Sequence, residues 1–355
     1  MLVKTLPMLM NPYTTTIIIT SLIMGPLLTI SSSHWILAWT GLEISTLAII
    51  PLIAKQHHPR AIEAATKYFL TQAIASTLIL FSSITNAWTS GQWNITQMFN
   101  DISSTILTTA LAIKLGLAPF HFWLPEVLQG TTMMTALTLT TWQKLAPLSL
   151  LVMMAQSMNT PLMLTLGLVS ATIGGWNGLN QTQLRKIMAF SSIAHLGWMA
   201  TILTLSPKLM LLTFYTYIIM TSTMFLMIKL LETNKISMMM TSWTKLPTLN
   251  TMMMLTLMSL AGLPPLTGFM PKWLIIQELT KQHMLIIATM MALLSLLNLF
   301  FYLRISYYAT ITLPPNSTNY LQQWRHKTNQ KHYLAPMTIL SITLLPITPT
   351  LLTII

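Results

Sequence analysis

Residues 114–126 read KLGLAPFHFWLPE, and the interpretation of the whole chain starts from this stretch. It places a lysine, a histidine and a glutamate beside two prolines, inside a run typical of a membrane-spanning helix. A charge at the bilayer centre costs about 2.5–3.5 kcal/mol on insertion scales, so such residues are rare and usually line an ion path. Pro119 and Pro125 remove the donors for the carbonyls of Leu115 and His121, so we expect the helix to kink or unwind. Because irregular backbone at membrane depth must be covered by protein or water, the stretch predicts a hydrated polar pocket.

The composition is that of an integral membrane protein. Of the 355 residues, 53% are hydrophobic and 7% are charged, whereas a soluble domain has about 25% charged residues. The net charge of +12 comes from basic residues spread singly and in short groups, which argues against nucleic-acid binding. The chain has no cysteine, which excludes disulfides, thiolate-held zinc, thiolate-bound haem and iron–sulfur clusters. We expect no cofactor, metal or redox centre in this chain.

Apolar runs between polar or Pro/Gly punctuation predict about eleven membrane-spanning helices, because about 20 mostly apolar residues cross the hydrocarbon layer. These runs lie near residues 13–31, 34–54, 60–88, 104–124, 133–155, 160–179, 184–205, 208–231, 247–270, 283–309 and 332–354. We therefore expect an all-α polytopic membrane protein, with one membrane domain over residues 1–355.

An internal repeat connects the fourth and ninth predicted helices. GLAPFHFWLPE at 116–126 aligns without a gap to GLPPLTGFMPK at 262–272, 146 positions later. This gives two five-helix units, residues 13–155 and 160–309, and a final helix over 332–354. Five is an odd number, so the two units must be inverted relative to one another, as in many transporters with broken helices.

The distribution of lysine and arginine indicates the orientation in the membrane. With the N-terminus inside, thirteen of these residues lie in inside loops or helix ends, two lie outside and three lie within spans. This bias predicts an inside N-terminus and an outside C-terminus, which requires an odd number of spans.

Four charged residues inside predicted spans are the main candidates for chemistry: Glu43, Lys114, Lys144 and Lys272. Pro147 follows Lys144 and frees the carbonyl of Gln143 beside the ammonium, and Lys272 comes directly after the second proline break. Burial disfavours a charged lysine, and a nearby glutamate restores it. A Lys–Glu pair that forms and breaks can therefore switch a second lysine between holding and releasing a proton. The alternatives are structural or snorkelling cations and a buried structural glutamate.

Two histidines are weaker candidates for proton transfer. His121 lies within the first break and His195 in the middle of the seventh predicted span. Each is either a proton relay or a hydrogen-bonded core residue. A metal site is not expected, because the only closely spaced pair, His57 and His58, is adjacent in a loop and points apart.

Six segments together carry the pattern of a known family: SHWILAWTGLEISTLAIIPL, RAIEAATKYFLTQAIAS, ALAIKLGLAPFHFWLPEVLQG, TWQKLAPL, NQTQLRKIMAFSSIAHLGWM and LAGLPPLTGFMPKW. They resemble the chain 2 family of mitochondrial NADH:ubiquinone oxidoreductase, respiratory complex I, one of the antiporter-like subunits. The resemblance runs from Asn11 through nearly the whole chain. HFWLPE favours chain 2 over the sister subunits, which are longer and differ after the HxWLP element.

The resemblance implies a multi-pass core subunit of the mitochondrial inner membrane, with the N-terminus on the matrix side and the C-terminus on the intermembrane side. It implies proton translocation, with Glu43 as partner of Lys114, Lys144 as the central lysine and Lys272 as the exit-side lysine. His195 would belong to the hydrated axis between them. NAD, FMN, iron–sulfur clusters and ubiquinone would be bound by partner subunits, and this chain would contact other complex I subunits and lipids.

Two departures from the family pattern and two rival functions are left open. Residues 1–9 precede the usual start at Met10, and Thr131-Thr132 stands where the family has an Ile-Pro pair. The rivals are a stand-alone cation/proton antiporter of the same architecture and a membrane scaffold whose buried charges only specify packing.

Overall fold

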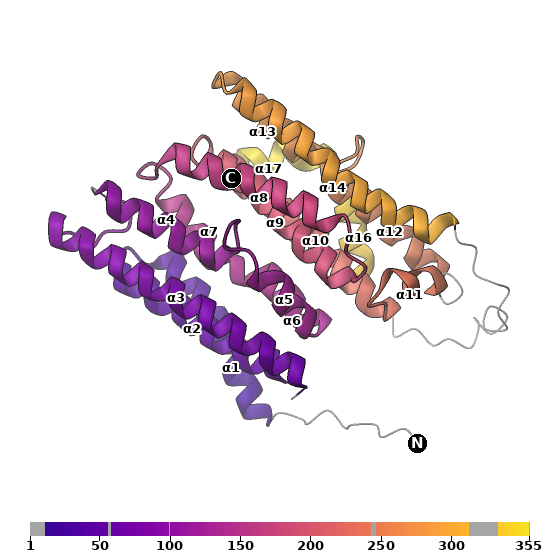
Figure 1. Ribbon diagram of the computed structural model, residues 1–355, viewed down its shortest axis with the longest axis horizontal. Helices are drawn as coiled ribbons and strands as arrows, with labels where there is room; N and C mark the ends of the chain where they lie inside the picture. The colour runs from indigo at the N-terminus through magenta and orange to yellow at the C-terminus, as the bar shows by residue number, and fades with distance from the viewer. Residues whose placement is uncertain (1–10, 56–57, 99, 243–245, 312–332, 355) are drawn as a thin grey trace. The chain divides into compact units, whose positions relative to one another are not determined.

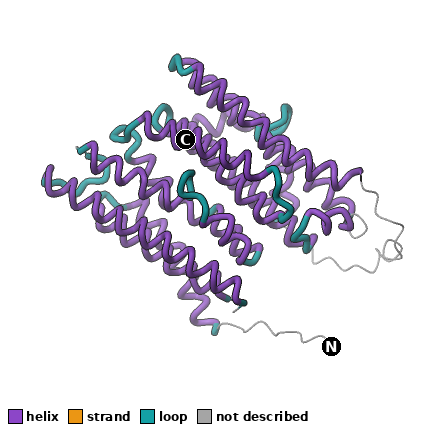
Figure 2. The backbone as a smooth tube through the Cα atoms, viewed as in Figure 1, coloured by secondary structure: helices purple, strands orange, loops and turns teal. Residues whose placement is uncertain are grey.

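The computed structural model describes residues 11–55, 58–98, 100–242, 246–311 and 333–354. These residues form helices and short loops, without a strand beyond two isolated backbone bridges (Figure 2). The chain divides into two compact units, Met1–Met163 (unit 1) and Leu164–Ile355 (unit 2). The expected all-α architecture is confirmed. Residues 1–9 and the polar connection over 314–331 lie outside the described residues.

Unit 1 contains seven described helices. They are α1 (Pro12–Ser31), α2 (Trp35–Ala54), α3 (Pro59–Ser90), α4 (Asp101–Leu115), α5 (Trp123–Gly130), α6 (Met133–Thr140) and α7 (Trp142–Met153). α1 packs on α2, α2 on α3, and α3 also on α4 and α5 (Figure 1). α1 and α2 approach closely because Gly25 and Gly41 face each other: a Cβ on either would lie 2.8 Å from the carbonyl oxygen of the other. Small residues allow such backbone approach between membrane helices.

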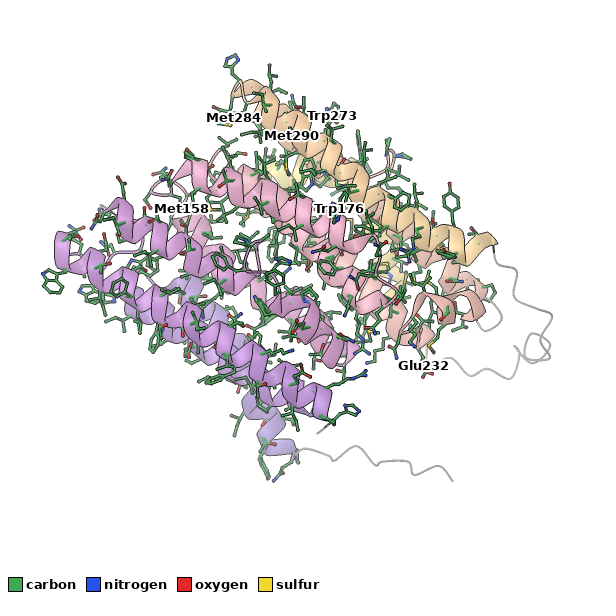
Figure 3. The ribbon with its side chains drawn as sticks, viewed as in Figure 1. Met158, Trp176, Glu232, Trp273, Met284 and Met290 are labelled. Carbon is green, nitrogen blue, oxygen red and sulfur yellow. The ribbon has the colours of Figure 1, made fainter. Side chains whose placement is uncertain are left out.

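Unit 2 holds the remaining helices that the structure describes. They are α8 (Thr160–Gly178, whose first residues belong to unit 1), α9 (Leu184–Leu203), α10 (Pro207–Leu231), α11 (Ile236–Thr241), α12 (Pro247–Ala261), α13 (Phe269–Lys281), α14 (Leu285–Ile311), α16 (Leu334–Thr343), η3 (Leu345–Ile347) and α17 (Thr348–Ile354). α10 packs against α9, α12 and α16. Large apolar side chains lie on the outside: Trp176 is 70% exposed, Trp273 54% and Met290 50% (Figure 3). Such a surface suits lipid or a partner chain.

The two predicted helix breaks are confirmed, and the backbone repeats closely. α4 and α12 begin and end 146 positions apart, and α5 and α13 begin with the same offset. α4 ends at Gly116 (φ +78°) and α12 at Gly262 (φ +81°), the left-handed conformation that glycine adopts without a Cβ clash. Both breaks contain a cis proline bond, at Pro119 and Pro265. The repeat boundaries and the inversion of the repeats stay predictions.

Six of the described helices are long and apolar enough to cross a membrane, by length and composition alone. They are α1, α2, α3, α9, α10 and α14. The pair from Leu334 to Thr353 makes a seventh if a helix bent by 69° counts as one span. The prediction of a multi-pass protein is therefore supported, and the count of eleven spans stays a prediction.

Three expectations about continuity were wrong. The span expected over 133–155 is interrupted at Thr141, whose hydroxyl donates to the carbonyl of Leu137 at 2.7 Å, a bond that often bends helices. Pro125 does not break a helix, because it sits in the first turn of α5, where its missing donor is not needed. The final helix expected over 332–354 is not one rod, since α16 and α17 meet at the 69° bend beside Pro346.

Candidate functional site

The first break satisfies its own backbone groups. The amides of Gly116 and Leu117 donate to the carbonyl of Ala112 at 2.9 and 3.0 Å. The indole Nε1 of Trp123 reaches back from α5 to the carbonyl of Ile113, at 3.1 Å. The end of α4 is thus held in a fixed geometry, with Lys114 in its last turn.

Lys114 and Lys144 line one polar cavity inside unit 1. Lys114 is 6% exposed and Lys144 is 3% exposed, so neither ammonium reaches the outside of the unit. The cavity has room for about one water molecule. It is lined by Leu42, Ser45, Thr46, Tyr68, Gln72, Lys114, Leu115, Trp123, Leu139, Gln143, Lys144 and Pro147. The structure thus brings together two lysines that are 30 positions apart in the sequence.

Glu43 lies beside this cavity and does not line it. Its neighbours Leu42, Ser45 and Thr46 are lining residues. Glu43 is half-buried, accepts from the hydroxyl of Thr46 at 3.5 Å, and lies close enough to Lys114 for an electrostatic interaction. The ion pairs found within 4.0 Å among the described residues do not include Glu43 with Lys114. In this conformation, Glu43 is therefore near Lys114 without forming a direct ion pair with it.

The sequence did not point to the other polar side chains of the cavity, among them Tyr68 and Gln72 on α3 and Gln143 on α7. A signal for the first two exists, because the buried residues of α3 recur every three or four positions. Tyr68 and Gln72 are one turn apart on that buried stripe. Gln143 donates to the carbonyl of Ser45 at 3.0 Å and so ties α7 to α2.

His121 lies inside the first break, as predicted, and is 2% exposed. Its Nδ1 is 3.2 Å from the carbonyl oxygen of Pro119, and its ring packs on Phe122 with centroids 4.3 Å apart. It is not among the residues that line the Lys114–Lys144 cavity. These contacts fit a hydrogen-bonded residue of the break, and the relay role of His121 stays a prediction.

Lys272 belongs to the second break, in unit 2. Its Nζ donates to the carbonyl oxygen of Ala261 at 2.7 Å, across the break from α13 to the end of α12. A helix C-terminus carries partial negative charge, which favours a cation there. The ammonium also lies over Gly262, since a Cβ at that position would be 2.9 Å from Nζ.

His195 lies on α9, also in unit 2, at intermediate exposure. Its ring centroid is 5.7 Å from that of Tyr217 on α10, and Ser192 shares a hydrogen bond with Tyr217. The residues around it are thus polar within a helical core. Lys272 and His195 are each described within unit 2, apart from the unit 1 cavity.

The site chemistry is that of amines, amides and hydroxyls. Among the described residues, no group of three or more histidine, cysteine, aspartate or glutamate side chains is placed to hold a metal ion. An amine pair with hydroxyl and amide neighbours in a small polar cavity can accept, hold and pass protons.

Two family models match the chain in succession. The transmembrane model of the NADH:quinone oxidoreductases and Mrp antiporters matches residues 32–298, and the C-terminal model of NADH dehydrogenase subunit 2 matches residues 299–352. The solved structures similar to it include a chain of respiratory complex I from Thermus thermophilus with bound aureothin, with a TM-score of 0.86 and 23% identity over 97% of this chain and 80% of that chain. A chain of the Mrp complex from Dietzia has a TM-score of 0.78 and 17% sequence identity, over 96% of this chain and 76% of that chain. These likenesses establish the antiporter-like fold.

Sequence relatives are much closer than these structures. NADH-ubiquinone oxidoreductase chain 2 of Struthio camelus is 62% identical over 343 residues, which is 97% of this chain and 99% of that protein. The chain 2 of Coturnix japonica is 62% identical over 346 residues, 98% of this chain and 100% of that protein. With both family models and near-complete coverage of these relatives, the chain belongs to the NADH-ubiquinone oxidoreductase chain 2 family.

Proposed function

We propose that Lys114 and Lys144 are proton-holding stations of a translocation path through unit 1. The observation that carries this proposal is their burial in one polar cavity of a membrane protein. Two ammonium groups in one buried cavity disfavour each other's charge. Protonation of one lysine therefore favours release from the other.

Membership of the chain 2 family identifies the complex in which these two lysines would act. The chain is a core membrane subunit of NADH:ubiquinone oxidoreductase, the respiratory complex that couples electron transfer from NADH to ubiquinone with proton translocation. Its partners are the other subunits of that complex. We propose that NAD, FMN, the iron–sulfur clusters and ubiquinone are bound by those partners. For the clusters, the absence of cysteine from this chain supports the proposal.

The remaining predicted residues take supporting roles in the proposal. Glu43 stabilises a charged Lys114 when it approaches, and Lys272 serves as the exit-side lysine of unit 2. His195 and His121 are proposed as additional relay groups. The positive-inside bias supports an N-terminus on the matrix side and a C-terminus on the intermembrane side of the inner membrane.

The free energy needed to move a proton across the membrane sets how much free energy the rest of the complex must supply. Moving one elementary charge against 100 mV requires about 2.3 kcal/mol. Electron transfer in the partner subunits must therefore shift the Lys–Glu equilibrium here by several kcal/mol, through conformational or electrostatic change. Glu43, half-buried beside the cavity, is the group in unit 1 that we expect to move.

The test is the variant Lys144→Met in the assembled complex, with proton translocation measured in proteoliposomes during NADH oxidation. We expect translocation to fall at least about tenfold, because a positioned proton-transfer group contributes about 10²–10⁴-fold. Lys281→Met is the matched control, since that lysine is exposed and pairs with Glu278 at 2.7 Å at the end of α13. The control should translocate normally.

The same measurement separates the rival functions. Normal assembly and undiminished translocation in Lys144→Met would overturn the proposal and show that the buried charges only specify packing, as in a membrane scaffold. Cation/proton exchange by the purified single chain, reconstituted without partners, would favour the antiporter reading. We expect no such exchange.

A further inference from the structure

Two buried polar groups face the same cavity without a hydrogen-bond partner among the described residues. They are the Nζ of Lys114 and the Nε2 of Gln72, whose residues are 6% and 4% exposed. An unsatisfied buried polar group costs about 1–3 kcal/mol, so each such group needs an explanation. Gln143, the other amide in the cavity, differs because its Nε2 already donates to the carbonyl of Ser45.

A second polar residue of α3, Tyr68, lines the cavity together with Gln72. It lies one helical turn before Gln72 and is 2% exposed. The ring of Tyr68 is held by an edge contact with Trp123, with centroids 5.7 Å apart. Trp123 is itself anchored to α4 by its indole hydrogen bond. The face of α3 that presents these groups is therefore fixed relative to Lys114.

The cavity has room for about one water molecule, and a buried water needs two to four polar partners. We propose that Gln72 is a positioning residue that holds a water between Lys114 and Lys144, with the Tyr68 hydroxyl as a further partner of that water. This inference rests on the proposed proton path through the two lysines, and it adds residues from α3 to that path.

The step balances with one water and two amines. An N–H bond of protonated Lys114 breaks as its proton forms an O–H bond with the water, and a different O–H bond of that water breaks as the proton forms an N–H bond at neutral Lys144. The water is regenerated, Lys114 becomes neutral and Lys144 becomes charged. The reverse transfer uses the same groups. Gln72 gains and loses no proton, because its amide only orients the water.

The test compares Gln72→Met with Gln72→His and Ser76→Ala in the assembled complex. Methionine matches glutamine in length and removes the amide, whereas histidine keeps a donor and an acceptor. Ser76 is the matched control, since it is on the same helix, is 4% exposed, does not line the cavity and donates to the carbonyl of Ala73. Proton translocation is measured in H₂O and in D₂O.

We expect Gln72→Met to lower translocation about tenfold and to raise the solvent isotope effect, since proton transfer then limits the rate. Gln72→His should recover most of the loss, and Ser76→Ala should behave as the wild type. A merely structural role of Gln72 would leave the isotope effect unchanged. Normal translocation and isotope effect in Gln72→Met, with Lys144→Met inactive, would overturn this inference and keep the proposed function. Normal translocation in both variants would overturn both.

A measurement on the unaltered complex covers the case in which Gln72→Met does not assemble. A density map of the complex should show an ordered water within hydrogen-bond distance of Lys114 Nζ and the Gln72 amide. A map in which the Gln72 amide bonds to another protein group, with no water beside Lys114, would overturn the inference.

Discussion

The two helix breaks have the same backbone conformation, but the lysine lies before the break in unit 1 and after it in unit 2. In unit 1 the buried lysine, Lys114, precedes the break, and the position after it is Glu126, which is exposed. In unit 2 the position that corresponds to Lys114 is Leu260, which is 0% exposed, and the position that corresponds to Glu126 is Lys272. Glu126 pairs with Lys67 at 2.6 Å, whereas Lys272 turns back to the carbonyl of Ala261 at 2.7 Å.

This difference separates the function of the backbone from that of the side chains. The glycine and proline pattern ends the helix in both units and exposes carbonyl groups near the break. In unit 1 the indole of Trp123 donates to one of these carbonyls, that of Ile113, and Lys114 lines the cavity. In unit 2 Lys272 itself donates to a different one, that of Ala261. The same break therefore supports an amine without a hydrogen-bond partner among the described residues in one unit and an amine bonded to a helix-end carbonyl in the other.

The largest expected effect comes from the position just before α5 and α13. Gly268 in unit 2 lies so close to α12 that a Cβ would sit 1.8 Å from the carbonyl oxygen of Ser259. Phe122 holds the same place in unit 1 and is 69% exposed. Gly268→Ala should destabilise the chain by about 3 kcal/mol, because overpacking against backbone cannot relax easily. The measurement is the temperature at which the complex loses this subunit, and Phe122→Ala should change it little. Equal effects of the two variants would show that the breaks are packed alike.

A middle-sized effect separates the two lysines themselves. Lys272→Met should cost about 1–2 kcal/mol, because the carbonyl of Ala261 loses its charged donor. Lys114→Met should leave stability unchanged or raise it, since methionine replaces a buried amine that has no hydrogen-bond partner among the described residues. Both variants should lose proton translocation. Thermal dissociation and proteoliposome assays measure the two properties separately. A larger loss of stability in Lys114→Met than in Lys272→Met would show that Lys114, too, is held by a stabilising contact.

The smallest expected effect is at Glu126. Its ion pair with Lys67 joins α5 to α3, and the two side chains are 51% and 41% exposed. Exposed pairs contribute about 0–1 kcal/mol, so Glu126→Gln should lower stability by roughly 0.5 kcal/mol and leave translocation near normal. A large loss of translocation in Glu126→Gln would assign the outer ion pair to the proton path.

The prediction from sequence was best where single residues constrain the backbone locally. The glycines and prolines of the two breaks predicted both interruptions, and the apolar runs predicted most helix ends to within a few residues. It failed where the local signal was ambiguous. α6 ends at Thr141, whose hydroxyl bonds to a carbonyl of the preceding turn, as the hydroxyls of many threonines inside continuous helices also do, and Pro125 is harmless only because a new helix begins at Trp123. The bend before α17 was not anticipated either.

The sequence by itself determined that the chain is a helical membrane protein with isolated charges and two broken helices, because hydropathy, proline and glycine act over a few residues at a time. Only the tertiary structure decided which polar groups meet. Tyr68 and Gln72 are ordinary residues of a long helix in the sequence, and the packing of α3 against α4 and α5 turns them toward Lys114. Which side chains of α3 face Lys114 depends on how separate helices pack together, and no local sequence pattern specifies that packing.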